Sequence, residues 1–385
     1  MRYRTPSYMD KFHCIADKCK DSCCIGWEID IDEKTKAYYE SVDTPFAERL
    51  KKDIKDGCFV LDEKERCPFL NDKNLCDIYI NLGKEHLCQI CSDHPRYYEW
   101  FGDLKEGGIG LSCEEAARVI LSNDFSLKET EIEEEEDLPD YDMEVFTALE
   151  KARDMILEKL NETGEKKVPL EFLLSWMLKY GKVLQLKLDE YSAEMEEIQE
   201  KVISELPEDA QIFGETNSEA AFGGNPSEES PFGADAKAHD DGIIEEDDLA
   251  QFLVDGRVRS TLMAYFQTLE PMSTSWIPFL EMCDQVNRMH ISDTKWLDEI
   301  NSEKYEIYFR RLASYFIYRY FMKAVFDLDA AGKIKFAVLS TYMIWLLARC
   351  TIELTGQCDF EDLALLAKNY SKEIEYSEEN LEKLM

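Results

Sequence analysis

The run FAVLSTYMIWLLA, at residues 336–348, is the stretch that most clearly indicates the fold class. Its thirteen residues carry no charge, but an α-helix needs about 20 apolar residues to cross a bilayer. We therefore expect a helix buried in a protein core and no transmembrane segment. The surrounding residues 246–385 contain no proline after Pro278, so this whole region is predicted to be largely helical.

Apolar side chains recur at helical spacing on both sides of the chain's middle. The first set lies within residues 145–205 and comprises Phe146, Leu149, Ala152, Ile156 and Leu160. The second set comprises Tyr305, Tyr308, Phe309, Leu312, Phe316, Tyr320 and Val325. Pro169 suits the first turn of a further helix, and Asp359 is a plausible N-cap. Alternating strand patterns are confined to short pieces such as residues 27–31, so we predict a mainly α protein.

Cysteines are concentrated at the start of the chain. Ten of the thirteen lie in the first 113 residues, and they are Cys14, Cys19, Cys23, Cys24, Cys58, Cys67, Cys76, Cys88, Cys91 and Cys113. Thiols at this density either close disulfides or bind a soft metal. The opening MRYRTPSYMDKFHC has charges and a proline but no apolar run, so we expect a cytoplasmic protein with reduced thiols. Metal binding is the favoured interpretation.

The cysteine spacing agrees with metal binding. Cys-x2-Cys pairs present two sulfurs to one metal, and a distant group completes the site. The predicted ligands are Cys14, Cys19, Cys23, Cys24, Cys67, Cys76, Cys88 and Cys91, while the part played by Cys113 is open. The adjacent Cys23 and Cys24 point in different directions in either a strand or a helix, so they can serve different centres. Eight or nine thiols exceed the four that one centre needs. Zinc and an iron–sulfur cluster both remain compatible with this pattern.

Acidic residues dominate the chain and are concentrated in particular segments. The formal net charge is −37, which argues against nucleic-acid binding. Ten acidic residues fall within residues 129–144, typical of a solvated linker, although such a block could also dock a basic partner. Residues 206–245 are rich in Gly, Pro, Ser and acids and are expected to be a disordered insertion. We predict an irregular Cys-rich metal-binding module at 1–127, packed on a helical bundle at 128–385 that contains the acidic linker 128–144.

Several short motifs resemble those of one protein family. They are Cys23-Cys24-Ile-Gly-Trp27, Cys67-Pro-Phe-Leu70, Leu75-Cys76-Asp-Ile78, Leu87-Cys88-Gln-Ile-Cys91, His94-Pro-Arg96 and Leu111-Ser-Cys113. Together with Cys14 and Cys19, they resemble the flagellin lysine-N-methylase (FliB) family, and the cysteines also resemble zinc- or iron-chelating proteins with a CxxCxxCC-type motif. The resemblance covers about the first 120 residues, and a weaker similarity lies near Tyr315–Phe321. The first two cysteine gaps are longer here, and His94 stands where the family pattern suggests an aromatic residue.

The resemblance implies a cytoplasmic bacterial enzyme that methylates flagellin lysines with S-adenosylmethionine and carries an iron–sulfur cluster, of the 4Fe-4S type. A non-catalytic zinc- or iron-binding protein, acting in metal chelation or redox sensing, is the alternative. Neither the glycine-rich turn of a Rossmann-like methyltransferase nor a CxxxCxxC triad is present, and Gly107, Gly108 and Gly110 suggest a turn. Arg96 could balance a cluster's charge or bind a carboxylate. Tyr97 and the aromatic residues after it could line a pocket beside the metal. Catalytic residues and oligomeric state are not indicated.

Overall fold

A computed structural model describes residues 1–26, 28–134, 141–164, 167–205, 255–293 and 303–385, with side chains of residues 198–205 left undescribed. Within these ranges helices predominate, so the predicted mainly α class is confirmed. The chain divides into two compact units, each assembled from segments far apart in sequence. Unit 1 comprises residues 1–138, 269–279 and 347–380, and unit 2 comprises residues 139–268, 280–346 and 381–385.

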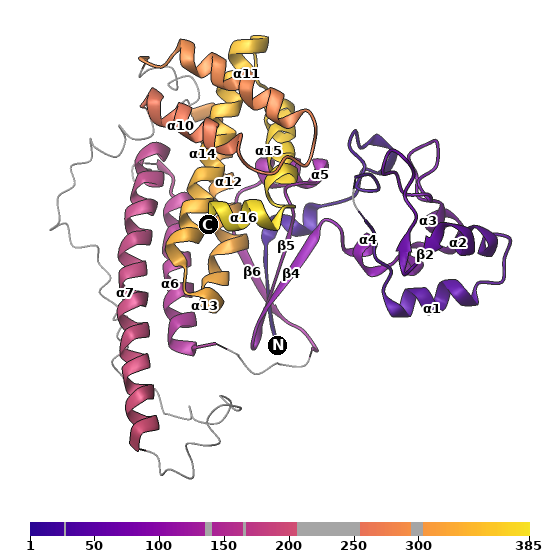
Figure 1. The fold of residues 1–385 in the computed structure, drawn as a ribbon, viewed down its shortest axis with the longest axis horizontal. Helices are drawn as coiled ribbons and strands as arrows, with labels where there is room; N and C mark the ends of the chain where they lie inside the picture. Colours follow the sequence, from indigo (N-terminus) through magenta and orange to yellow (C-terminus); the bar gives the residue numbers. More distant parts are fainter. Residues whose placement is uncertain (27, 135–140, 165–166, 206–254, 294–302) are drawn as a thin grey trace. The chain divides into compact units, whose positions relative to one another are not determined.

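A four-stranded sheet lies in unit 1, and its strands run side by side in Figure 1. The strand order is β4-β5-β1-β6, with β1 parallel to β5 and antiparallel to β6. The strands are β1 (Arg2–Pro6), β4 (Arg96–Phe101), β5 (Leu104–Ile109) and β6 (Leu127–Glu131). The expectation that strands would be only short pieces is therefore wrong for this region.

The predicted turn at Gly107 and Gly108 is also wrong, because both residues belong to β5. The hairpin turns earlier, between Phe101 and Leu104, where Gly102 has a φ of 56°. At position 107 the strand has a glycine because aromatic side chains cover this position. An added Cβ would lie 2.7 Å from the Tyr3 hydroxyl. Glycine here makes room for neighbouring rings and is not a sign of a turn.

The Cys-rich residues of unit 1 form short elements around a small core of their own. These elements are α1 (Glu33–Ser41), α2 (Ala47–Asp53), β2 (Ile54–Lys55), β3 (Cys58–Phe59), α3 (Asp77–Leu82) and α4 (Gln89–Asp93). Their buried side chains include Ile29, Ile31, Leu50, Phe59, Phe69 and Ile78. Two further helices, α5 (Glu114–Ser122) and α15 (Phe360–Ile374), pack together in the same unit. Arg118 on α5 binds Glu361 on α15 at 2.6 Å.

Unit 2 is built from helices, as the periodicity predicts. Helices α6 and α7 pack against each other and against α12, and Figure 1 shows α6 and α7 running alongside one another. The remaining helices of the chain include some that continue into unit 1. Within the described residues, the helices of unit 2 and those that extend from it are α6 (Met143–Leu160), α7 (Leu170–Glu205), α10 (Gly256–Phe266), α11 (Trp276–Met289), α12 (Glu303–Tyr320), α13 (Ala324–Asp327), α14 (Ala330–Thr355) and α16 (Glu378–Leu384).

Most of the helical predictions hold, but the apolar set that ends at Val325 spans α12 and α13, and its Tyr308 is only half-buried. All five apolar residues predicted within 145–205 are buried on α6, and α7 begins directly after Pro169. Asp359 caps α15 through a reciprocal capping box with Asp362. The run 336–348 lies within α14. Helix α14 is long and apolar enough to cross a membrane by composition alone, yet 78% of its most apolar window is buried inside the protein.

The acidic segment and the insertion are described only in part. Strand β6 occupies the first residues of the predicted linker 128–144, and α6 begins at its end. Residues 135–140 and the predicted insertion 206–245 lie outside the described residues. The boundary at residue 127 stays a prediction, since the compact units are each made from several segments.

Candidate metal centre

Five cysteines belong to the small core of the Cys-rich region. Cys67 and Cys88 are among its buried residues, and Cys24, Cys76 and Cys91 pack against it. They come from four separate places in the sequence. Backbone pairing brings the first two together, because the Cys67 N–H donates to the Cys24 carbonyl at 2.8 Å. The fold thus gathers more thiols in one core than a single mononuclear site needs. We refer to these five as the core thiols.

Backbone N–H groups point at several of these sulfurs. The N–H groups of Phe69 and Leu70 donate to the Cys67 sulfur within the Cys-Pro-Phe-Leu turn. Those of Ile78 and Tyr79 donate to the Cys76 sulfur. Cys76 and Cys88 are the residues immediately before α3 and α4. Donors of this kind stabilise a thiolate, which is the form that binds metal.

Arg49 joins two of the ligand-bearing segments. Its guanidinium donates to the Pro68 carbonyl and, at 2.5 Å, to the Asp77 carboxylate. Pro68 follows Cys67 and Asp77 follows Cys76, so one side chain fixes the spacing of two candidate ligands. No sequence pattern indicated this role of Arg49, because the residue lies on α2, away from every cysteine motif.

Asp32 also joins two segments of the Cys-rich region. Its carboxylate accepts from the Thr35 N–H at 2.9 Å, capping α1, and from the Gln89 N–H at 2.8 Å at the start of α4. Burial opposes the charged form of Asp32, but these donors outweigh it and lower its pKa. The helix that bears Cys91 is therefore anchored to α1.

Burial disfavours the charged form of two of the core thiols, Cys67 and Cys76. Burial raises the pKa of Cys67 to about 12 and also raises the pKa of Cys76. Cys91 donates to Cys88, which lowers the pKa of Cys88 and raises that of Cys91. A metal cation would reverse the balance, because coordination stabilises the thiolate.

A second group of cysteines lies beside the start of α5. Cys113 is the residue before this helix. The Cys19 sulfur lies 3.6 Å from the Glu114 carboxylate, which also accepts from the Lys20 N–H at 2.7 Å. Cys14 and Cys113 are both near enough to Cys23 to raise its pKa. We call Cys14, Cys19, Cys23 and Cys113 the α5 thiols.

The adjacent Cys23 and Cys24 divide between the two groups. Cys23 interacts with the α5 thiols, and Cys24 interacts with Cys67, Cys76 and Cys91. A hydrogen bond between the two thiols raises the pKa of Cys23 and lowers that of Cys24 to about 7. Whether the two cysteines serve different roles or centres stays a prediction.

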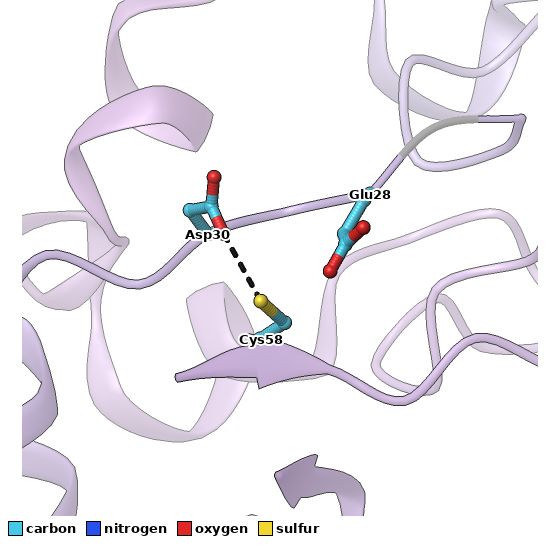
Figure 2. A group of neighbouring side chains, drawn as sticks. All are labelled: Glu28, Asp30 and Cys58. Atoms are coloured by element: carbon cyan, nitrogen blue, oxygen red, sulfur yellow. Dashed lines mark hydrogen bonds between the residues drawn. The ribbon is translucent and has the colours of Figure 1, made fainter. Parts of the chain in front are cut away.

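Figure 2 shows a further group, formed by Glu28, Asp30 and Cys58, whose candidate ligand atoms all lie within 4.8 Å of one another. The Cys58 thiol donates to Asp30 at 3.0 Å. Both carboxylates are exposed. Across the ranges that the structure covers, no three thiols lie together this tightly.

Arg96 and Tyr97 lie on β4, where their contacts are mainly with aromatic residues and glycine. The Arg96 guanidinium lies 5.2 Å from the centre of the Phe12 ring. The Tyr97 ring covers Gly108, where an added Cβ would lie 2.3 Å from its hydroxyl. Burial lowers the pKa of the neighbouring His94 to about 4, so its imidazole is neutral. The part of Arg96 and Tyr97 in cofactor binding stays a prediction.

Unit 2 has a separate open cavity of about 370 Å³. Its lining carries cations, carboxylates and one aromatic ring, from Tyr320, Lys323, Asp327, Asp329, Lys333, Leu381, Glu382 and Met385. Lys333 already binds Asp327 at 2.6 Å. A polar ligand with charges of both signs would find partners here.

Comparisons with known proteins point to the same family, but the family model matches a different region of the chain from the cysteine motifs. The model of the FliB lysine N-methylase C-terminal domain matches residues 248–385. This segment lies outside the cysteine motifs and contains the cavity of unit 2. The sequence pattern had indicated only a weak likeness there, near residues 315–321.

Individual relatives come from Salmonella. Lysine-N-methylases of Salmonella typhimurium and Salmonella choleraesuis are each 27% identical over 132 residues, which is 31% of this chain and 32% of theirs. The flagellar biosynthetic protein FliU of Salmonella muenchen is 26% identical over 132 residues, 31% of this chain and 76% of that protein. The match thus spans about a third of the length of the two lysine-N-methylases. No solved structure matches the chain.

Proposed function

We propose that the chain is a protein lysine N-methyltransferase, because residues 248–385 match the model of the FliB lysine N-methylase C-terminal domain. Its methyl donor is S-adenosylmethionine, and its substrate is flagellin in the bacterial cytoplasm. The family match is the observation that carries the proposal. The flagellar name of one relative, FliU, supports the choice of substrate. The net charge of −37 also suits a lysine-bearing substrate, because an acidic surface attracts cations.

We propose further that the core thiols hold an iron–sulfur cluster. Five sulfurs share one core, and backbone N–H groups already point at two of them. Thiolates with this support are typical ligands of such clusters. Four of the five would bind iron, while the fifth would pack. When bound by four thiolates, the cluster would be coordinatively closed and would supply one-electron chemistry or structural support.

Methyl transfer to a lysine places two requirements on the active site. A free lysine side chain has a pKa of about 10.4, so an enzyme must favour its neutral form to make it a nucleophile. A desolvated channel achieves this, because burial lowers the pKa of an amine. The reaction also requires the amine nitrogen to face the sulfonium methyl group.

The cavity of unit 2 is our candidate for the donor's binding place. S-adenosylmethionine carries an ammonium, a carboxylate and a sulfonium, and the cavity lining offers carboxylates together with Lys323 and Lys333. The cavity also lies within the segment that matches the family. Replacing Lys323 by Gln should weaken donor binding measured by calorimetry, while Lys335→Gln on α14, outside the cavity lining, serves as the matched control.

One assay tests the activity and separates it from the alternative. Full-length protein, purified and loaded with iron and sulfide under anaerobic conditions, is incubated with flagellin and methyl-labelled S-adenosylmethionine. We expect label on flagellin lysines, and we expect Cys67→Ser to lose it while Cys58→Ser retains it. Cluster-replete protein that binds metal but neither binds the donor nor labels flagellin would indicate the non-catalytic metal-binding function instead.

A further inference from the structure

Three aromatic rings surround the ammonium of Lys105 on the sheet of unit 1. Its Nζ atom lies 4.9 Å from the ring centre of Trp100, 5.0 Å from that of Tyr98 and 6.0 Å from that of Tyr3. All three distances are within the range of a cation–π contact. Lys105 is therefore held in an aromatic cage formed by Tyr3, Tyr98 and Trp100.

The strand register builds this cage. Trp100 and Tyr3 are the paired neighbours of Lys105 on β4 and β1, and Tyr98 is the paired neighbour of Gly107. Because alternate residues of a strand share a face, the three rings and Lys105 project from the same side of the sheet. Gly107 leaves the space that the rings need, since an added Cβ would lie 2.7 Å from the Tyr3 hydroxyl and 3.2 Å from Tyr98.

A carboxylate completes the cage. The two oxygens of Glu134 lie 2.7 and 2.9 Å from the Lys105 Nζ atom, and the Trp100 side chain also hydrogen-bonds to Glu134. The Lys105 side chain is only 13% exposed, whereas Glu134 is 43% and Trp100 is 47% exposed. The ammonium is thus walled by rings but remains reachable from the side of Glu134 and Trp100.

Aromatic walls with a carboxylate are the arrangement that recognises methylated ammonium groups. The attraction of the rings depends on the positive charge and not on N–H donors. A methylated lysine keeps that charge, so the cage would still hold it after each N–H is replaced. A simple salt bridge is weakened when methyl groups replace the N–H donors, because its geometry relies on those donors.

We propose that Lys105 is itself a methylation site of this protein and that the cage retains the methylated side chain. The inference rests on the proposed methyltransferase activity. In the transfer, the Lys105 ammonium first gives one proton to water, and the lone pair of the resulting neutral amine takes the methyl group from the sulfonium of S-adenosylmethionine. The carbon–sulfur bond breaks, sulfur keeps the electron pair as the thioether of S-adenosylhomocysteine, and the product is a positively charged methylammonium.

The test uses cluster-loaded, full-length protein incubated with methyl-labelled S-adenosylmethionine and flagellin, followed by peptide mass spectrometry of both proteins. We expect label on the peptide that contains Lys105. Lys52 is the internal control, because it is 83% exposed and pairs only with a neighbouring carboxylate, that of Asp53. Methylation governed by exposure alone would label Lys52 at least as strongly.

Two variants test the methylated position and the role of the cage separately. Lys105→Arg keeps a cation in the cage and should abolish label at this position without reducing label on flagellin. Trp100→Leu removes one wall and should lower label at Lys105. Labelled flagellin with an unlabelled Lys105 would overturn this inference alone, and label on neither protein would overturn the activity as well. Equal label on Lys105 and Lys52 that ignores Trp100→Leu would also refute a part for the cage.

Discussion

Arg49 illustrates how a residue outside every motif can position a metal site. It holds the Pro68 carbonyl and the Asp77 carboxylate, so two candidate ligand segments share one guanidinium. A planar fork with several donors is suited to such a bridge, and a lysine cannot reproduce it. Sequence reasoning found the cysteines through their spacing but missed Arg49, since nothing in its local sequence marks a contact made only in the folded chain.

Replacing Arg49 by Lys should therefore weaken metal binding. Losing a residue that orients metal ligands typically costs about 10–100-fold in metal affinity. Iron retained after dialysis against a competing chelator measures the effect. Lys51→Arg, on the same helix but largely exposed, is the matched control. Unchanged iron retention in Arg49→Lys would show that the core thiols do not depend on this bridge.

At the level of elements, helices were predictable and the sheet was not. The helices of unit 2 bury apolar residues at a regular spacing, which single-sequence patterns reveal. The strands carry sequences such as RYRTP, LKEGGI and LKETE, in which charges and glycines interrupt any alternation. Their pairing is fixed by partners distant in sequence, including the parallel contact of β1 with β5. That information is absent from any local window.

The cap of α15 gives a prediction at this scale. The Asp359 carboxylate accepts from the Asp362 N–H at 3.0 Å, and the Asp362 carboxylate accepts from the Asp359 N–H at 3.0 Å. Asp359→Ala should lower the free energy of unfolding by about 1 kcal/mol, measured by urea denaturation. Asp359→Asn retains a side-chain acceptor and should cost only a fraction of that. Equal losses in both variants would mean that the carboxylate charge, and not the cap, stabilises the helix.

For the whole molecule, the division into units separates the candidate metal core from the helices that match the family. The core thiols lie within unit 1, while most of the 248–385 match, including the cavity lining, lies within unit 2. The cysteine motifs of unit 1 carried the resemblance and the expected cofactor, whereas the family model matches the C-terminal segment, residues 248–385.

Removing metal should accordingly act on one unit. A ligand that binds only the folded state stabilises it by about 2.7 kcal/mol at a concentration 100 times its dissociation constant, and a buried cluster joins several segments of the small core. Treatment of the iron-loaded protein with a strong chelator should therefore speed amide hydrogen exchange in α3 and α4, next to Cys76 and Cys88. Exchange in the buried part of α14 within unit 2, residues 330–346, should stay unchanged. Faster exchange in α14 to the same extent would show instead that the metal stabilises the chain as a single cooperative unit.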